Sequence, residues 1–261
     1  MATKSKNILN DEILSFLYSS PAFQQLSEDK QQSFLQMFRE DQYFKEVITT
    51  AMSLQETIIE VEATMPKMRD KDVLIPPEAH KKLMKEQTQV EGNVYFVPFE
   101  NNRKNAAPFI ICLQQSDSIA EYELLCKGML LPLFNVCVRQ KRDLIIIPFA
   151  QSVGEPFVFE FGHLEQELFN EFIHSALTDN AQIVPALQKA ISIFEQDKVK
   201  IDSELMIVTD NQFTDFNMLL NSDIAQQLAN LNVEVSVIAM SEVDFEVQPI
   251  PFADKVFYVN E

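Results

Sequence analysis

The chain has 261 residues, of which 46% are hydrophobic and 23% charged, an ordinary balance for a protein with a buried core. Its formal net charge of −18 argues against nucleic acid and anionic membranes as partners, because both are negatively charged. The four glycines are not clustered, so the glycine-rich loops that cradle nucleotide phosphates are absent.

Residues 1–90 are predicted to form a helical N-terminal region followed by a connector. Apolar side chains recur at helical spacing between residues 7 and 64, with a break at Ser20-Pro21. A short helix is expected at 78–88. The phenylalanines of this region admit two interpretations, a core between helices or a face that grips a partner. The residues concerned are Phe16, Phe34, Phe38 and Phe44.

Residues 91–261 change in character, because short apolar runs now alternate with amphipathic segments. Strands are predicted at 94–99, 108–113, 144–149, 156–161, 205–208, 233–240 and 255–259. Helices are predicted at 119–140, with a kink at Pro132, and at 164–176, 184–196 and 222–232. This alternation predicts an α/β fold: a doubly wound, mostly parallel sheet flanked by helices.

Ligand sites in such sheets lie beyond the carboxyl ends of the strands. Two of the segments at this edge carry grouped polar residues. The first reads Cys112-Leu-Gln-Gln-Ser-Asp-Ser118, and the second reads Ile207-Val-Thr-Asp-Asn211.

These two segments resemble the von Willebrand factor A family, in which a first strand ends in Asp-x-Ser-x-Ser and a later one in Ser/Thr-Asp-Gly. The resemblance covers about residues 106–261. Further phrases are similar to the bacterial CoxE/ViaA-like branch, among them Arg139-Gln-Lys-Arg-Asp-Leu-Ile-Ile-Ile-Pro-Phe-Ala150. That branch carries its A domain behind a helical N-terminal region, and its members commonly work beside a MoxR-type AAA+ ATPase. The resemblance therefore implies such an ATPase as partner.

The family's loops form a metal-ion-dependent adhesion site, and this chain departs from it. Ser116, Ser118 and Asp210 match expected ligands. Gln114 stands where the family has its first Asp, and Ala181 where it has a Thr. Mg²⁺ prefers carboxylates, hydroxyls and water, and the loss of one carboxylate removes much of the attraction for a dication. We expect the metal site to be lost or weak, with no resident cofactor.

Two alternatives remain open for these loops. In one, the site is rebuilt and the missing charge comes from Asp117, Asp179 or Asp215. In the other, Ser116, Ser118 and Asp210 mainly cap turns and helices. In either case the same side chains, Gln114 included, form the predicted partner-binding face.

Three cysteines are predicted to be buried, reduced thiols: Cys112, Cys126 and Cys137. The first residues contain no apolar stretch typical of a signal peptide, and no apolar run reaches the ~18 residues of a membrane span. A cytoplasmic protein is expected. No Gly-x-Ser-x-Gly nucleophile motif is present, and no set of residues supports catalysis.

The sequence thus predicts a non-catalytic, cytoplasmic protein–protein interaction module, an adaptor of a MoxR-type ATPase. Two other hypotheses stay open. One is a structural subunit of a larger phage or secretion assembly, and the other is a metal-dependent hydrolase, because fold alone does not exclude chemistry.

Overall fold

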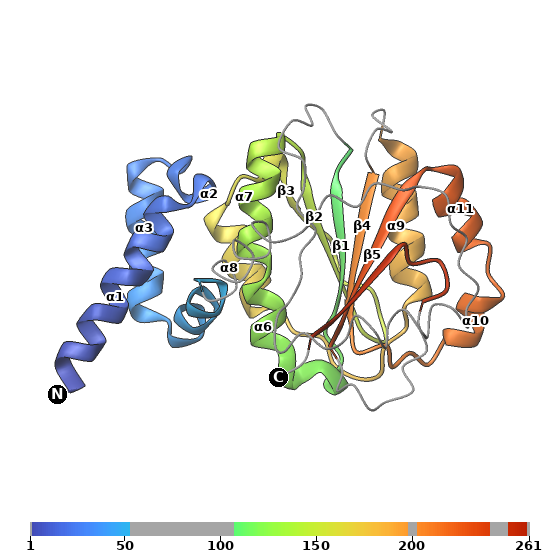
Figure 1. The fold of residues 1–261 in the computed structure, drawn as a ribbon, viewed down its shortest axis with the longest axis horizontal. Coiled ribbons are helices and arrows are strands. Elements are labelled where there is room, and N and C mark those ends of the chain that lie inside the picture. Colours follow the sequence, from blue (N-terminus) through green and yellow to red (C-terminus); the bar gives the residue numbers. More distant parts are fainter. Residues whose placement is uncertain (1, 53–106, 198–202, 241–249, 260–261) are drawn as a thin grey trace, which may run out of the picture.

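The computed structural model describes residues 2–52, 107–197, 203–240 and 250–259 (Figure 1). At its centre lies a six-stranded sheet of order β3-β2-β1-β4-β5-β6, parallel except for β3, which runs antiparallel to β2. The strands are β1 (Phe109–Gln114), β2 (Leu144–Phe149), β3 (Phe157–Phe159), β4 (Ser203–Thr209), β5 (Val233–Met240) and β6 (Lys255–Val259). The predicted doubly wound sheet is confirmed.

Helices cover both faces of this sheet (Figure 1). One face carries α6 (Glu123–Gly128), α7 (Leu130–Gln140) and α8 (Gln166–His174), and the other carries α9 (Val184–Gln196), α10 (Phe216–Leu220) and α11 (Ile224–Asn230). Two 3₁₀ segments, η1 (Asp117–Tyr122) and η2 (Glu160–Gly162), complete the domain. Because side chains alternate along a strand, Ile111 of β1 joins the core under α7, whereas Ile110 joins the core under α9.

Two predicted helices differ from the observed ones. The helix predicted at 119–140 is interrupted at Met129, between α6 and α7, and not at Pro132. Pro132 lies in the first turn of α7, where backbone N–H groups have no partner within the helix, so no kink follows. The helix predicted at 222–232 is shorter, and the unpredicted α10 precedes it. The predictions at 78–88 and 94–99 lie outside the described residues.

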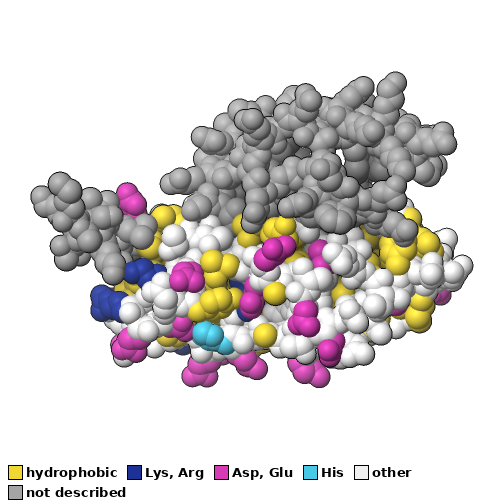
Figure 2. Space-filling view, turned by 90° about the horizontal axis from the view of Figure 1, so that it is seen from below, with side chains coloured by type: hydrophobic (Ala, Val, Ile, Leu, Met, Phe, Trp, Pro, Cys, Tyr) yellow, Lys and Arg dark blue, Asp and Glu magenta, His cyan; other side chains and the backbone are white. Residues whose placement is uncertain are grey.

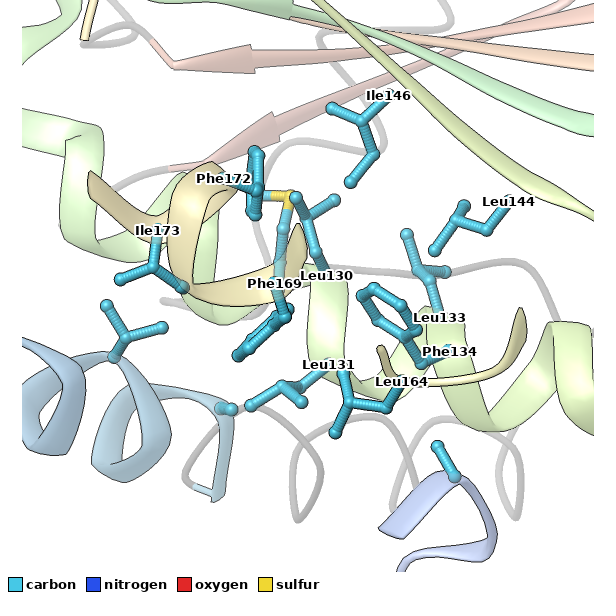
Figure 3. Close-up of a cluster of buried hydrophobic side chains, with 14 of the residues drawn as sticks. Leu130, Leu131, Leu133, Phe134, Leu144, Ile146, Leu164, Phe169, Phe172 and Ile173 are labelled. Carbon is cyan, nitrogen blue, oxygen red and sulfur yellow. The ribbon is translucent and has the colours of Figure 1, made fainter. Parts of the chain in front are cut away.

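The N-terminal helices pack on the outer side of α7 and α8 (Figure 1). They are α1 (Ala2–Ser19), α2 (Pro21–Gln24), α3 (Glu28–Glu40) and a helix over residues 42–52. Phe34, Phe38 and Phe44 are buried, and the rings of Phe34 and Phe169 stack with centroids 5.9 Å apart. Phe16 is partly buried against the same core. Figure 3 shows the side chains of α7 and α8 that fill this core. The core interpretation of these phenylalanines is confirmed.

Hydrogen bonds also join the two regions. The Asn135 side-chain oxygen on α7 accepts from Ser20 Oγ at 2.7 Å and from the Ala22 backbone N–H at 3.1 Å. His174 Nε2 at the end of α8 lies 2.7 Å from the Asp41 carboxylate. The backbone hydrogen bond from Phe44 to Asp41 is the main cause that lowers the pKa of this carboxyl group. The helical region and the sheet domain therefore share one interface.

A buried lysine lies at the same interface. Lys127 Nζ donates to the Glu123 carboxylate at 2.5 Å and to the carbonyl oxygens of Ile173 and Ser175 at 2.6 and 2.9 Å. It also lies 5.3 Å from the centre of the Tyr43 ring. Burial lowers the pKa of Lys127 and raises the pKa of Tyr43. Lys127 thus links α6, the end of α8 and the N-terminal helices.

The three cysteines are free and buried, as predicted. Burial raises the pKa of the Cys112 and Cys137 thiols to about 12, and it also raises the pKa of Cys126. Such thiols stay protonated and unreactive at neutral pH. Within the described ranges, none of the helices combines the length and apolar character that a membrane crossing requires.

Candidate functional site

The chain reverses its winding direction between β1 and β4, which are neighbours in the sheet although β2 and β3 lie between them in sequence. A crevice at the carboxyl ends of two such strands is the usual ligand position in an open α/β sheet. The parallel register pairs Leu113 with Val208, so Gln114 emerges beside Thr209 and Asp210. We use "carboxyl edge" for the loops at this end, residues 114–118, 178–182 and 209–215.

The Gln114 side-chain amide lies at the centre of the carboxyl edge. Its Nε2 atom lies 2.5 Å from Ser116 Oγ, 2.9 Å from Asp210 Oδ1 and 3.3 Å from Ser118 Oγ. The two serine hydroxyls lie 2.9 Å from each other. Ser116, Ser118 and Asp210 match metal ligands of the family. They therefore surround the side-chain nitrogen of Gln114, which stands where the family has an Asp.

The other end of the amide fixes its orientation. Gln114 Oε1 accepts from the Thr209 hydroxyl at 2.5 Å and from the Asp210 backbone N–H at 3.3 Å. Because a backbone N–H can only donate, the atom facing it is the oxygen, and Nε2 faces the serines and the Asp210 carboxylate. Gln114 is only 2% exposed and Thr209 is fully buried.

Thr209 is the residue of this network that sequence reasoning missed. Its hydroxyl donates to Gln114 and accepts from the Asn211 backbone N–H at 2.8 Å, so it supports both strand ends. The only signal in the sequence was its place just before Asp210, at the last position of a buried strand.

Asp210 is held by one carboxylate oxygen only. Oδ1 accepts from Gln114 Nε2 and from the Gln212 backbone N–H at 2.8 Å. Oδ2 is buried, and so is the side-chain oxygen of Asn211, and neither has a hydrogen-bond partner in the described part of the chain. The side chain of Asp210 as a whole is buried, with 5% exposure for the residue.

The loop 178–182 has no hydroxyl at position 181, where the family has its Thr. Ala181 is buried, and its carbonyl oxygen accepts from the backbone N–H and the hydroxyl of Thr214 at 2.9 and 3.1 Å. Asp179 is exposed at a positive φ of 74°, and its carbonyl oxygen accepts from the Asp117 backbone N–H at 3.3 Å. Both aspartates are thus brought to the carboxyl edge, with exposed side chains.

Asp215 has a different position from the other acidic candidates. Its two carboxylate oxygens accept from the backbone N–H groups of Ile183 and Val184, at 3.0 and 2.8 Å. These groups begin α9, so Asp215 caps that helix from a distant loop. The structure therefore engages this carboxylate in the fold, and Asp117 and Asp179 remain the exposed acidic candidates.

The arrangement does not fit a divalent cation well. A dication binds lone pairs of oxygen atoms, whereas the Gln114 amide directs N–H groups toward the oxygens that would supply them. Among the described residues, no three His, Cys, Asp or Glu side chains gather in a way that could hold a metal ion. The network can instead hold the ends of β1 and β4 together without an ion.

No protein-family model matches this chain, and no curated protein matches it. Solved structures that are similar to it include the SpRpn10 VWA domain, at 12% identity and a TM-score of 0.42, over 59% of this chain and 87% of that one. Another is the manganese-loaded TRAP protein of Plasmodium vivax, at 12% identity and a TM-score of 0.40, over 54% and 59%. A third is an aerotolerance-related membrane protein from Bacteroides fragilis, at 13% identity and a TM-score of 0.37, over 60% and 81%.

Proposed function

We propose that this chain is a non-catalytic protein–protein interaction module of the von Willebrand factor A type, which binds its partner at the carboxyl edge without a divalent metal. The observation that carries the proposal is the position of the Gln114 amide. Its nitrogen lies within hydrogen-bond distance of Ser116, Ser118 and Asp210, the side chains that match the family's ligands.

The energetic reason is competition between the amide and a cation. Mg²⁺ requires oxygen ligands at about 2.1 Å in octahedral geometry. To bind there, it would have to displace an amide whose two ends make the hydrogen bonds described above. Each such buried bond contributes about 1 kcal/mol, and the cation would regain only one carboxylate, that of Asp210. A site with one carboxylate and no Thr at position 181 does not offset that loss.

A metal-free site changes how a partner is recognised. In an intact adhesion site the metal takes a carboxylate from the partner, and here that bridge is missing. Recognition then depends on shape, hydrogen bonds and apolar anchors. The exposed side chains of these loops that remain for this task are Asp117, Ser118, Thr178, Asp179, Asn180, Gln212 and Thr214.

Calorimetric titration with Mg²⁺, Mn²⁺ and Ca²⁺ tests the proposal. We expect no saturable heat from the natural chain up to low millimolar metal. The double variant Gln114→Asp/Ala181→Thr restores the carboxylate and the hydroxyl, and it should gain saturable binding that a further Asp210→Ala change abolishes. Micromolar binding by the natural chain, lost in Asp210→Ala, would overturn the metal-free proposal.

We further propose that the chain belongs to the CoxE/ViaA-like branch and serves in the cytoplasm as adaptor of a MoxR-type AAA+ ATPase. The support is the order of the two regions, a helical N-terminus packed on an A-type sheet domain, together with the sequence phrases quoted above. Pull-down with a purified MoxR-type ATPase, with and without ATP and in the presence of EDTA, tests this step. Fixed-stoichiometry binding to other proteins that is insensitive to ATP would favour a structural subunit instead.

A further inference from the structure

The charged residues of the sheet domain are unevenly placed. No Lys or Arg occurs in residues 105–126, 143–188 or 201–254, the segments that contain every loop of the carboxyl edge. Arg139, Lys141 and Arg142 lie at the last turn of α7 or just after it, and Lys255 lies at the start of β6, all at the opposite end of the strands. Lys127 is buried in its own ion pair. The carboxyl edge is therefore acidic without basic residues of its own loops.

Figure 2 looks onto this end of the molecule. Asp and Glu side chains are spread over the visible described part of the face, whereas Lys and Arg gather mainly toward the N-terminal helices. A surface of one sign attracts ligands of the opposite sign and repels its own. The charge pattern indicates a preference for positively charged ligands. Buried oxygen atoms at the same edge provide a second, independent observation.

In the part of the chain that the structure describes, three buried acceptor atoms at the ends of β1 and β4 have no donor. They are Gln115 Oε1, Asp210 Oδ2 and Asn211 Oδ1. Among the described residues, no buried side-chain donor without a partner belongs to these loops. An unpaired buried acceptor is costly, and two of these belong to consecutive residues beside the exposed Ser118 and Gln212. The chemistry that would satisfy them is a group with several N–H donors.

Two exposed apolar side chains lie on the helix that follows the loop carrying Asp210 and Asn211. Met218 and Leu220, on the helix that follows the 209–215 loop, are 59% and 51% exposed. Both are among the large hydrophobic side chains that the described structure leaves exposed. Beside them Phe213 and Phe216 are partly buried against the sheet core. Apolar anchors of this kind suit a peptide segment better than a free ion.

We propose that the carboxyl edge binds a basic segment of the partner protein, with an Arg or Lys side chain at the exposed carboxylates of Asp117 and Asp179, directed toward the buried Asp210, and an apolar residue on Met218 or Leu220. The proposal rests on the metal-free function proposed above. It reverses the charge preference of an intact adhesion site, which takes a carboxylate through its metal. Arg suits the position best, because its guanidinium presents five donors in a fixed plane.

The test uses the full chain in EDTA and two 12-residue peptides that differ only in four positions, Arg in one and Glu in the other, with Leu between them. Binding is measured by fluorescence anisotropy at low and at 300 mM salt. The Arg peptide should bind at least about tenfold more tightly than the Glu peptide, and salt should weaken it. Equal binding of the two peptides would overturn the inference while leaving the metal-free function intact.

Two charge-removal variants distinguish specific binding of the Arg peptide at the carboxyl edge from its general attraction to an acidic protein. Asp117→Asn/Asp179→Asn removes two exposed charges at the carboxyl edge, and we expect binding about three- to tenfold weaker. The matched control, Glu160→Gln/Glu167→Gln, removes two exposed charges near the other end of the sheet and should change binding less than about twofold. Equal losses in the two variants would overturn the inference.

Two further measurements complete the experiment. Asp210→Asn keeps the oxygen that accepts from Gln114 but loses the charge, and Met218→Ser removes the apolar anchor; each should weaken binding of the Arg peptide. Mn²⁺ in place of EDTA should leave the preference unchanged. If Mn²⁺ instead creates tight binding of the Glu peptide, the metal-free function itself is wrong, a result distinct from failure of the Arg preference.

Discussion

The Gln114→Glu variant is the sharpest probe of the carboxyl edge, because it changes one atom and almost no volume. In the natural chain Gln114 Nε2 donates toward Asp210 Oδ1 over 2.9 Å. In the variant a carboxylate oxygen occupies that position, and a donor–acceptor pair becomes a pair of negative oxygens. Oε1 keeps its place, because Thr209 and the Asp210 backbone still donate to it.

The magnitude follows from the distance. Two unit charges 2.9 Å apart repel by about 6 kcal/mol at an effective dielectric constant of 20. The hydroxyls of Ser116 and Ser118 can rotate to donate to the new carboxylate, which recovers part of this energy. We expect a net loss of about 3–5 kcal/mol in the free energy of unfolding at pH 7.

The loss should depend on pH, because the two carboxylates can share a proton in the folded state. The folded variant then binds more protons than the unfolded chain near pH 5–7, so its stability falls as the pH rises through this range. Urea unfolding at pH 5, 6 and 7 measures the effect. Added Mn²⁺ should also recover stability, since it neutralises the pair.

Gln115→Glu is the matched control. Gln115 Nε2 donates to the Ser175 carbonyl oxygen and hydroxyl, so a new carboxylate there meets a carbonyl oxygen and a hydroxyl rather than a second carboxylate. Mn²⁺ should therefore recover less stability for Gln115→Glu than for Gln114→Glu. If Gln114→Glu is as stable as the natural chain at pH 7 and also shows no acid recovery, the Gln114 amide does not lie between Ser116 and Asp210.

Three more predictions concern the rest of the fold. Asn135→Ala leaves two donors of the N-terminal helices unpaired and should cost about 2 kcal/mol in urea unfolding; no change would mean that these helices do not depend on α7. Lys127→Met removes the donor of the Ile173 carbonyl and the Glu123 carboxylate and leaves the Ser175 carbonyl with Gln115, and thermal unfolding should show a loss of about 3 kcal/mol. The raised pKa values of three buried thiols mean that the folded state keeps protons that the unfolded chain loses above pH 9. Stability present below pH 9 should therefore fall by about 3 kcal/mol between pH 9 and 10 under reducing conditions. Replacing Cys112, Cys126 and Cys137 by Ala should remove that fall, and an unchanged slope would contradict the assignment.

The sheet could be predicted because its strands carry their own signal. Phe109–Gln114 and Leu144–Phe149 are runs in which every residue is buried, as expected for parallel strands covered on both faces. Polar residues that follow such strands meet at one edge of the sheet. This rule correctly predicted that Gln114, Ser116 and Asp210 lie close together. The strand order that makes it so could be expected only by resemblance.

Helix boundaries were less predictable, because local pattern and tertiary packing compete there. The apolar stripe at 119–140 continues through Met129, yet the chain breaks at that residue and resumes as α7. Gly128 lies at this break, and a Cβ there would come within 2.7 Å of Thr50 Cγ2. The close approach of a helix 78 residues away in sequence cannot be inferred from the local pattern.

The sequence by itself determined the α/β class, the buried thiols and the side chains that meet at the carboxyl edge, because hydrophobic periodicity and strand direction are local properties. Only the tertiary structure decided what those side chains do. It turned the Gln114 nitrogen toward the serines and Asp210, used Asp215 to cap α9, and placed the N-terminal phenylalanines against α8. Hydrogen-bond direction and burial depend on groups far apart in the chain, and a linear pattern of residue types does not contain them.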